Sequence, residues 1–117
     1  MIDKITEASL LYDFYGQLLT KRKQQVMELY HEENMSLAEI AEEFGISRAA
    51  VHDSLKSAEK ALTEYENKLG LIAKFMNTNQ VIQGIDKKLE KIVDDHRNDE
   101  ALVKSLNDIK KIIEELD

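Results

Sequence analysis

The sequence predicts an all-α protein with short helices in its first half, a long helix in the middle and a helical hairpin at its C-terminal end. The 117 residues include no proline and only four glycines, whereas Ala, Leu, Glu and Lys, which favour helices, are abundant. Apolar residues recur at spacings of three and four along most of the chain, as they do on one face of a helix. This length fits one domain, or a small domain with an appendage, and we expect the two parts to be residues 1–70 and 71–117.

Two helices are predicted before the middle of the chain. Residues 3–19 form the first, with a broad apolar face that includes Leu11 and Tyr15 and indicates burial against more than one neighbour. Thr20 is a good cap for the second helix, which should continue to about Glu33.

Three cations, Lys21, Arg22 and Lys23, fill the first turn of this second helix. The helix dipole favours anions at that end, so each cation opposes it by up to about 1 kcal/mol at low salt. A bound phosphate would offset this cost, because free helix amides and cations converge on the same anion. The alternative is a solvated surface cluster whose cost is lowered by screening.

The stretch MSLAEIAEEFGISRAAVHDSL, residues 35–55, reads as two helices joined by a very short turn. Ser36 and Glu39 form a capping box at the start of the first, and Gly45 supplies the left-handed conformation that ends it. Ser47 then caps the next helix. The residues predicted to be buried on the first of these helices are Leu37, Ile40, Ala41 and Phe44. The pattern is typical of a helix-turn-helix, and the alternative is a corner between two helices of an ordinary helical protein.

The second helix of this motif should continue from Ser47 to Gly70, because its apolar positions do not break off. Only its first turns could enter a groove of nucleic acid, and Arg48, His52 and Lys56 lie along one outward stripe there. The neighbouring alanines offer no hydrogen bonds and Asp53 repels phosphate, so base-specific reading of DNA is poorly supported. A solvated helix face is the alternative. The predicted nucleic-acid-binding residues are Lys21, Arg22, Lys23, Ser47, Arg48, His52 and Lys56.

Residues 71–95 predict a further helix, with a polar interruption at 77–80 that could kink or fray it. A turn at 94–98 follows, and Asn98 is the expected cap of a last helix. Leucines and isoleucines follow a four-three repeat in that last helix. The two helices form an antiparallel hairpin with much apolar surface, for which we expect a role in homodimerisation, against packing within one chain as the alternative.

The net charge of −7 is unusual for a nucleic-acid-binding protein, which commonly presents a broad basic surface. The part before Gly70 has net charge −5 and the part after it −2. Any contact with phosphate must therefore come from a local cluster, and its affinity should be modest and strongly reduced by salt.

The residues for catalysis or metal binding are mostly missing. Cysteine is absent, and the three histidines, His31, His52 and His96, lie far apart in the sequence. The four glycines make no loop that cradles phosphate, and no motif of an enzyme family is found, so we expect neither an enzyme nor a cofactor. The chain begins without the pattern of a signal peptide and has no apolar run of membrane-spanning length, which favours a soluble cytoplasmic protein.

Two stretches of the sequence carry a resemblance to a known family. Residues 19–71, LTKRKQQVMELYHEENMSLAEIAEEFGISRAAVHDSLKSAEKALTEYENKLGL, together with LLYDFYGQL at 10–18, resemble the YlxM family of small bacterial proteins. That family is similar in turn to the fourth region of bacterial sigma factors, which docks a helix-turn-helix on promoter DNA. The resemblance covers residues 8–75 and implies a fold like that region. It also implies a place in the signal recognition particle pathway, since family members are typically encoded beside that particle's GTPase and are thought to associate with its RNA or GTPases.

The sequence departs from the sigma pattern just after the Ser47–Arg48 pair. Ala49, Ala50 and His52 stand where a sigma factor has charged or polar side chains, which argues against promoter reading. One hypothesis is therefore an accessory protein of the particle that grips RNA phosphates and contacts the GTPase through acidic or hairpin surfaces. A second is a dimeric transcriptional regulator bound to duplex DNA, and a third is an adaptor that binds protein alone.

Overall fold

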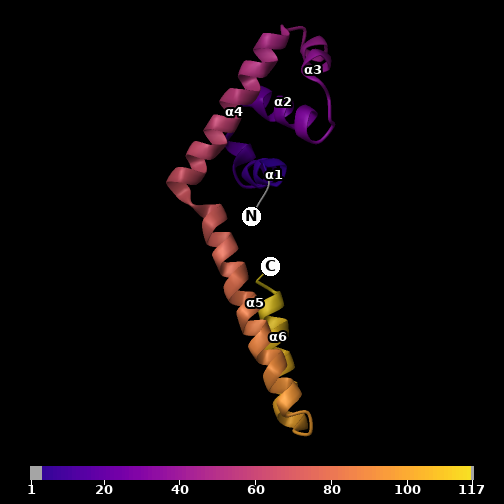
Figure 1. Ribbon diagram of the computed structural model, residues 1–117, viewed down its shortest axis with the longest axis vertical. Coiled ribbons are helices and arrows are strands. Elements are labelled where there is room, and N and C mark those ends of the chain that lie inside the picture. The colour runs from indigo at the N-terminus through magenta and orange to yellow at the C-terminus, as the bar shows by residue number, and fades with distance from the viewer. Residues whose placement is uncertain (1–3, 117) are drawn as a thin grey trace. The chain divides into compact units, whose positions relative to one another are not determined.

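The computed structural model describes residues 4–116, which form helices and no strand, so the all-α prediction is confirmed (Figure 1). The chain divides into two compact units, the first ending at Ile72 and the second beginning at Ala73. The elements in order are α1 (Lys4–Tyr15), the short 3₁₀ helix η1 (Gly16–Leu18), α2 (Lys21–His31), α3 (Leu37–Phe44), α4 (Arg48–Leu69), α5 (Leu71–Asp95) and α6 (Glu100–Glu114). Among the described residues, no helix is both long enough and apolar enough to cross a bilayer.

The helix-turn-helix consists of α3 and α4, and its predicted local signals are confirmed. The Ser36 hydroxyl accepts a hydrogen bond from the Glu39 amide, while the Glu39 carboxylate accepts one from the Ser36 amide, both at 3.1 Å. Gly45 ends α3 in the left-handed conformation, with φ of 64°. Ser47 Oγ then accepts a hydrogen bond from the Ala50 amide at 3.0 Å and starts α4. Two caps and one glycine thus set both ends of α3 and the start of α4, and Gly70, with φ of 62°, ends α4.

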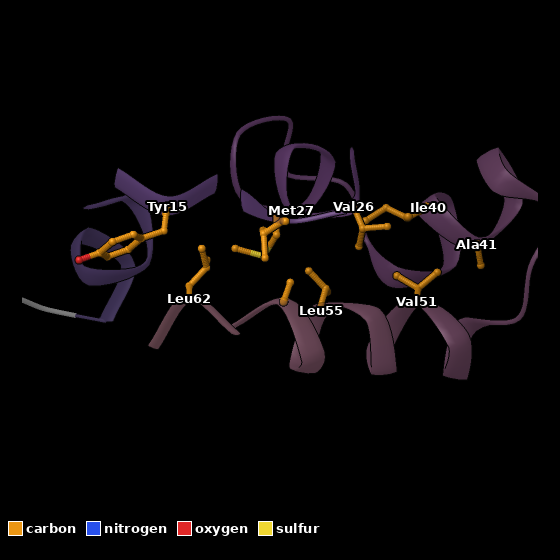
Figure 2. Packing of buried hydrophobic residues seen from close by; sticks show 10 residues of the cluster. Tyr15, Val26, Met27, Ile40, Ala41, Val51, Leu55 and Leu62 are labelled. Carbon is orange, nitrogen blue, oxygen red and sulfur yellow. The ribbon is translucent and has the colours of Figure 1, made fainter. Parts of the chain in front are cut away.

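A single apolar core holds the four helices of the first unit together. Val26 and Met27 of α2 and Ile40 of α3 are fully buried against α4. Figure 2 shows how these side chains point toward one another from the facing helices. The α4 residues buried in this core are Val51, Leu55, Ala58 and Leu62, which recur at three- and four-residue spacing. That stripe fixes α3 at a set angle to α4 and leaves the opposite face of α4 to solvent.

The first helix is shorter than predicted. It ends at Tyr15 rather than continuing to residue 19, and residue 3, where we expected it to begin, lies outside the described residues. The chain tightens into η1, where Nε2 of the Gln24 side chain of α2 donates hydrogen bonds to the carbonyls of Gly16, at 2.9 Å, and Leu19, at 3.3 Å. This turn rotates Leu18 outward, where it is 55% exposed. A contact from the next helix therefore decides where α1 ends.

A partly buried pair of polar groups closes the far end of the first unit. The Tyr15 hydroxyl donates to Glu66 Oε1 at 2.5 Å and accepts a hydrogen bond from the Leu71 amide at 3.1 Å. Glu66 Oε1 also accepts a hydrogen bond from the Ile72 amide at 3.0 Å. Burial, with the Glu66 carboxylate beside it, raises the pKa of the Tyr15 hydroxyl above its ordinary value. Side chains from α1 and α4 thus satisfy the free amides at the start of α5.

The second unit is a hairpin of α5 and α6. The polar stretch 77–80 does not break α5, which is continuous from Leu71 to Asp95, because exposed polar side chains cost a helix little. Asp99, not Asn98, caps α6, since its carboxylate accepts a hydrogen bond from the Leu102 amide at 3.1 Å. The turn at 96–98 brings the chain round one residue later than expected, and a carboxylate suits the positive end of the helix.

Candidate nucleic-acid interface

The cationic first turn of α2 is held in place by Thr20. The Thr20 hydroxyl oxygen accepts a hydrogen bond from the Lys23 amide at 3.4 Å, as predicted for a helix cap. Lys21 and Arg22 are exposed and Lys23 is half-buried. The cap satisfies one of the free amides at this end of the helix, next to three positive side chains.

Arg22 connects this turn to the helix-turn-helix. Its guanidinium carbon lies 4.5 Å from the centre of the Phe44 ring, a distance typical of a cation stacked on an aromatic face. Phe44 is the last residue of α3 and immediately precedes Gly45. The stack therefore places one positive charge of α2 beside the turn of the motif.

A shallow groove of about 380 Å³ lies where α3 meets the start of α4. Its lining residues are Leu37, Arg48, Ala49, His52 and Asp53. The α4 side chains among them are all exposed, since Val51 and Leu55 take the buried face of the helix. The groove therefore presents one permanent cation, one histidine, one carboxylate and two small or apolar side chains.

Asp53 limits what this groove can bind. His52 Nδ1 lies 3.8 Å from Asp53 Oδ1, so the histidine, when protonated, faces a carboxylate of its own helix. Asp53 also repels phosphate, and Ala49 offers no hydrogen bond to a base edge. Among the residues that line the groove, Arg48 is thus the side chain whose charge and geometry best suit a phosphate.

The structure brings together some of the predicted site residues and not others. Arg48 and His52 share the groove, and Ser47 serves as the cap of α4, with its hydroxyl oxygen already used as an acceptor. Lys56 is exposed one turn further along α4, outside the residues that line the groove. Within residues 4–116, Arg22 contacts the motif through Phe44, whereas Lys21 and Lys23 show no such contact.

Two residues of this surface were not predicted from the sequence. Phe44 was expected only as a core residue, and Leu37 likewise, yet Phe44 carries the Arg22 guanidinium and Leu37 lines the groove. Both contacts depend on how α2, α3 and α4 pack. No spacing in the sequence signals them, because the partners come from different helices.

The clefts on the other side of the first unit are acidic. One of about 250 Å³ is lined by Tyr12, Asp13, Glu28 and Glu32 among others, and its neighbour includes Glu7 and Glu59. The Tyr12 hydroxyl donates to Glu28 Oε1 at 2.7 Å, and burial together with that carboxylate raises the pKa of Tyr12 above its ordinary value. The outer face of α3 is acidic too, since Glu39, Glu42 and Glu43 line a further groove there. Carboxylates repel phosphate, so the candidate interface is confined to the cations beside the turn, Arg22 and Arg48.

Comparison with known proteins gives one family. A family model described as "Putative helix-turn-helix protein, YlxM / p13 like" matches residues 2–108. A UPF0122 protein of Desulforamulus reducens is 45% identical over 109 residues, which cover 91% of this chain and 90% of that protein. UPF0122 proteins of Lactococcus lactis subsp. cremoris and Bacillus mycoides are 40% and 38% identical, over 114 and 117 residues. The former match covers 97% of this chain and 96% of the relative, and the latter covers both in full.

These matches confirm the resemblance found in the sequence. A helix-turn-helix family indicates a binding or regulatory role that involves nucleic acid, rather than catalysis. The motif that the family description specifies is the one formed here by α3 and α4. The chain belongs to the UPF0122 family of YlxM/p13-like helix-turn-helix proteins.

Proposed function

We propose that this protein is an accessory component of the signal recognition particle pathway that binds the particle's RNA through its helix-turn-helix unit. The observation that carries the proposal is the Arg22–Phe44 stack, which holds a cation of α2 beside the turn that leads to Arg48. Cations from two helices, with the free amides of α2 behind them, suit a phosphate backbone that passes over the motif.

RNA is favoured over DNA because the surface has charge but few base-reading groups. In A-form RNA the major groove is deep and narrow, and proteins recognise the duplex mainly by its shape, phosphates and 2′-hydroxyls. Ala49 and Asp53 are poor readers of base edges in a DNA major groove, whereas Arg22 and Arg48 suffice for phosphates. The pathway itself is suggested by the resemblance to YlxM proteins, and the particle's GTPase is a second proposed partner through the acidic surfaces.

Duplex DNA is the alternative ligand, and one observation favours it. The first turns of α4 are exposed on the side away from the core, as a helix that enters a major groove must be. A transcriptional regulator of this kind would place Arg48, His52 and Lys56 against the bases and bind a palindromic site as a dimer.

The test is a salt titration of binding to three nucleic acids: the particle's RNA, an unrelated structured RNA and random duplex DNA. We compare the wild-type chain with K21A/R22A/K23A and with the charge-matched control K91A/K104A/K111A, whose lysines are exposed on α5 and α6. The first variant should lose affinity for the particle's RNA. Its salt slope should flatten by about two to three units, at about 0.7–0.9 per lost phosphate contact, while the control keeps the wild-type slope.

Each result separates the hypotheses. Equal affinity of the wild-type chain for all three nucleic acids would contradict a role specific to the particle, and preference for duplex DNA would favour the regulator. An unchanged slope for K21A/R22A/K23A would remove the α2 cations from the interface. Binding to the isolated GTPase with no binding to RNA would make a protein the principal ligand.

A further inference from the structure

The hairpin of the second unit has an apolar face that its own two helices do not cover. Leu89 of α5 and Leu106 of α6 are its buried residues, and Glu90 Oε1 lies 3.7 Å from Lys110 Nζ. This ion pair is one contact between the two antiparallel helices, and Figure 1 shows α6 running back beside α5. Six large aliphatic side chains nevertheless remain between 39% and 69% exposed: Val81, Ile85 and Ile92 of α5, and Ile109, Ile112 and Leu116 of α6.

The helical repeat places these six side chains on one face of the hairpin. Ile92 follows Leu89 by three residues and Ile109 follows Leu106 by three, so each is rotated in the same sense from the buried leucine of its helix. In an antiparallel pair, equal rotations in the same sense lead to the same side of the pair. Because Glu90 lies beside Lys110, Ile92 is near the level of Ile109, which makes a continuous apolar strip.

Charged side chains of opposite sign border this strip. On α5 the border consists of Lys88, three residues after Ile85, and Asp95, three residues after Ile92. On α6 it consists of Asp108 and Glu115, four residues before and three after Ile112. All four charged residues are exposed. A second copy packed with its α6 over this α5 brings its acidic border to Lys88, and the same contact repeats across the two-fold axis.

We propose that the strip is the interface between two copies of this chain, which pair their hairpins into an antiparallel four-helix bundle. Each α5 packs against the α6 of the other copy, with the six aliphatic side chains inside and the charged borders at the edges. Four helices are the smallest arrangement in which two such hairpins bury both apolar strips. The border of mixed sign favours a second copy over nucleic acid, which would meet the carboxylates of α6. This proposal does not depend on which ligand the first unit binds.

The test measures the mass of the full chain by sedimentation across a range of concentrations. The mass measured for the wild-type protein should rise with concentration from that of one chain, 13.5 kDa, to twice that value. Ile112→Glu should keep it at one chain mass, whereas the control Asn107→Glu, an exposed position on the far side of α6, should leave association unchanged. One chain mass for the wild type at every concentration would overturn the proposal, as would dimers of Ile112→Glu.

A charge exchange separates pairing of copies from packing within one chain. Lys88→Glu alone, and D108K/E115K alone, put like charges at both borders and should each weaken association at least tenfold. Mixed together, these two proteins have opposite charges at both borders of a heterodimer, so association should return to near the wild-type strength. A mixture that stays as weak as its components, or a Lys88→Glu chain that associates normally, would contradict the proposed packing.

Discussion

Replacement of Gly45 by alanine tests the turn on which the motif depends. Gly45 has φ of 64°, and a Cβ atom built there meets no atom within 4 Å, so the cost of a side chain comes from the backbone alone. An L-residue in the left-handed region costs about 1–2 kcal/mol. Gly45→Ala should therefore lower the free energy of unfolding of the first unit by about that amount.

The sign of the effect makes this experiment decisive. Gly84 lies inside α5, also with open space around it, and Gly84→Ala should stabilise the hairpin by up to about 1 kcal/mol because alanine is the better helix former. Urea unfolding followed by far-ultraviolet circular dichroism measures the unfolding free energy of both variants. Gly45→Asn should cost less than Gly45→Ala, since asparagine tolerates the left-handed region. If Gly45→Ala stabilised the chain as Gly84→Ala does, residue 45 would lie in a continuous helix and the helix-turn-helix would be wrong.

Three further predictions concern the polar contacts of the first unit. Tyr15→Phe removes one of the donors to the Glu66 carboxylate and the acceptor of the Leu71 amide, and should cost about 1–3 kcal/mol of unfolding free energy. A change no larger than that of Ser9→Ala would contradict the contact. Because the pKa of Tyr12 and of Tyr15 is raised on folding, these tyrosines ionise first in the unfolded chain. Their contribution to stability should therefore be constant below about pH 10 and fall above it, and the double Phe variant should lose that part of the fall. A double-mutant cycle of Arg22→Ala and Phe44→Leu should give a coupling of about 0.5–1 kcal/mol, and a coupling of zero would show that the stack does not form in solution.

The parts of the fold that could be predicted are those with local causes. Ser36, Gly45, Ser47 and Gly70 act through their own hydroxyl or their own backbone freedom, and each was placed correctly from its neighbours in the sequence. The cap of α6 shows the limit of this reasoning. Two capping residues stand side by side there, and only the path of the turn decides that Asp99 takes the role.

The contacts that were missed join residues far apart in the chain. Tyr15 and Glu66 are 51 positions apart, and Arg22 meets Phe44 across a helix pair. Periodicity tells which side of a helix is buried, but it does not tell which exposed side chain of one helix meets which of another. The early end of α1 has the same origin, because Gln24 of α2 holds the carbonyls that end it. For the candidate interface, the sequence could name the cations but not the aromatic ring that orients one of them.

The most direct test of the account is a map of amide chemical shifts as the particle's RNA is added to the isotopically labelled full chain. We predict that the largest shifts fall at residues 20–23 and 44–56, where the cations of α2 and the start of α4 flank Phe44, and that they diminish as salt is raised. Shifts confined to the acidic clefts around α1, or to the hairpin of α5 and α6, would contradict binding by the helix-turn-helix.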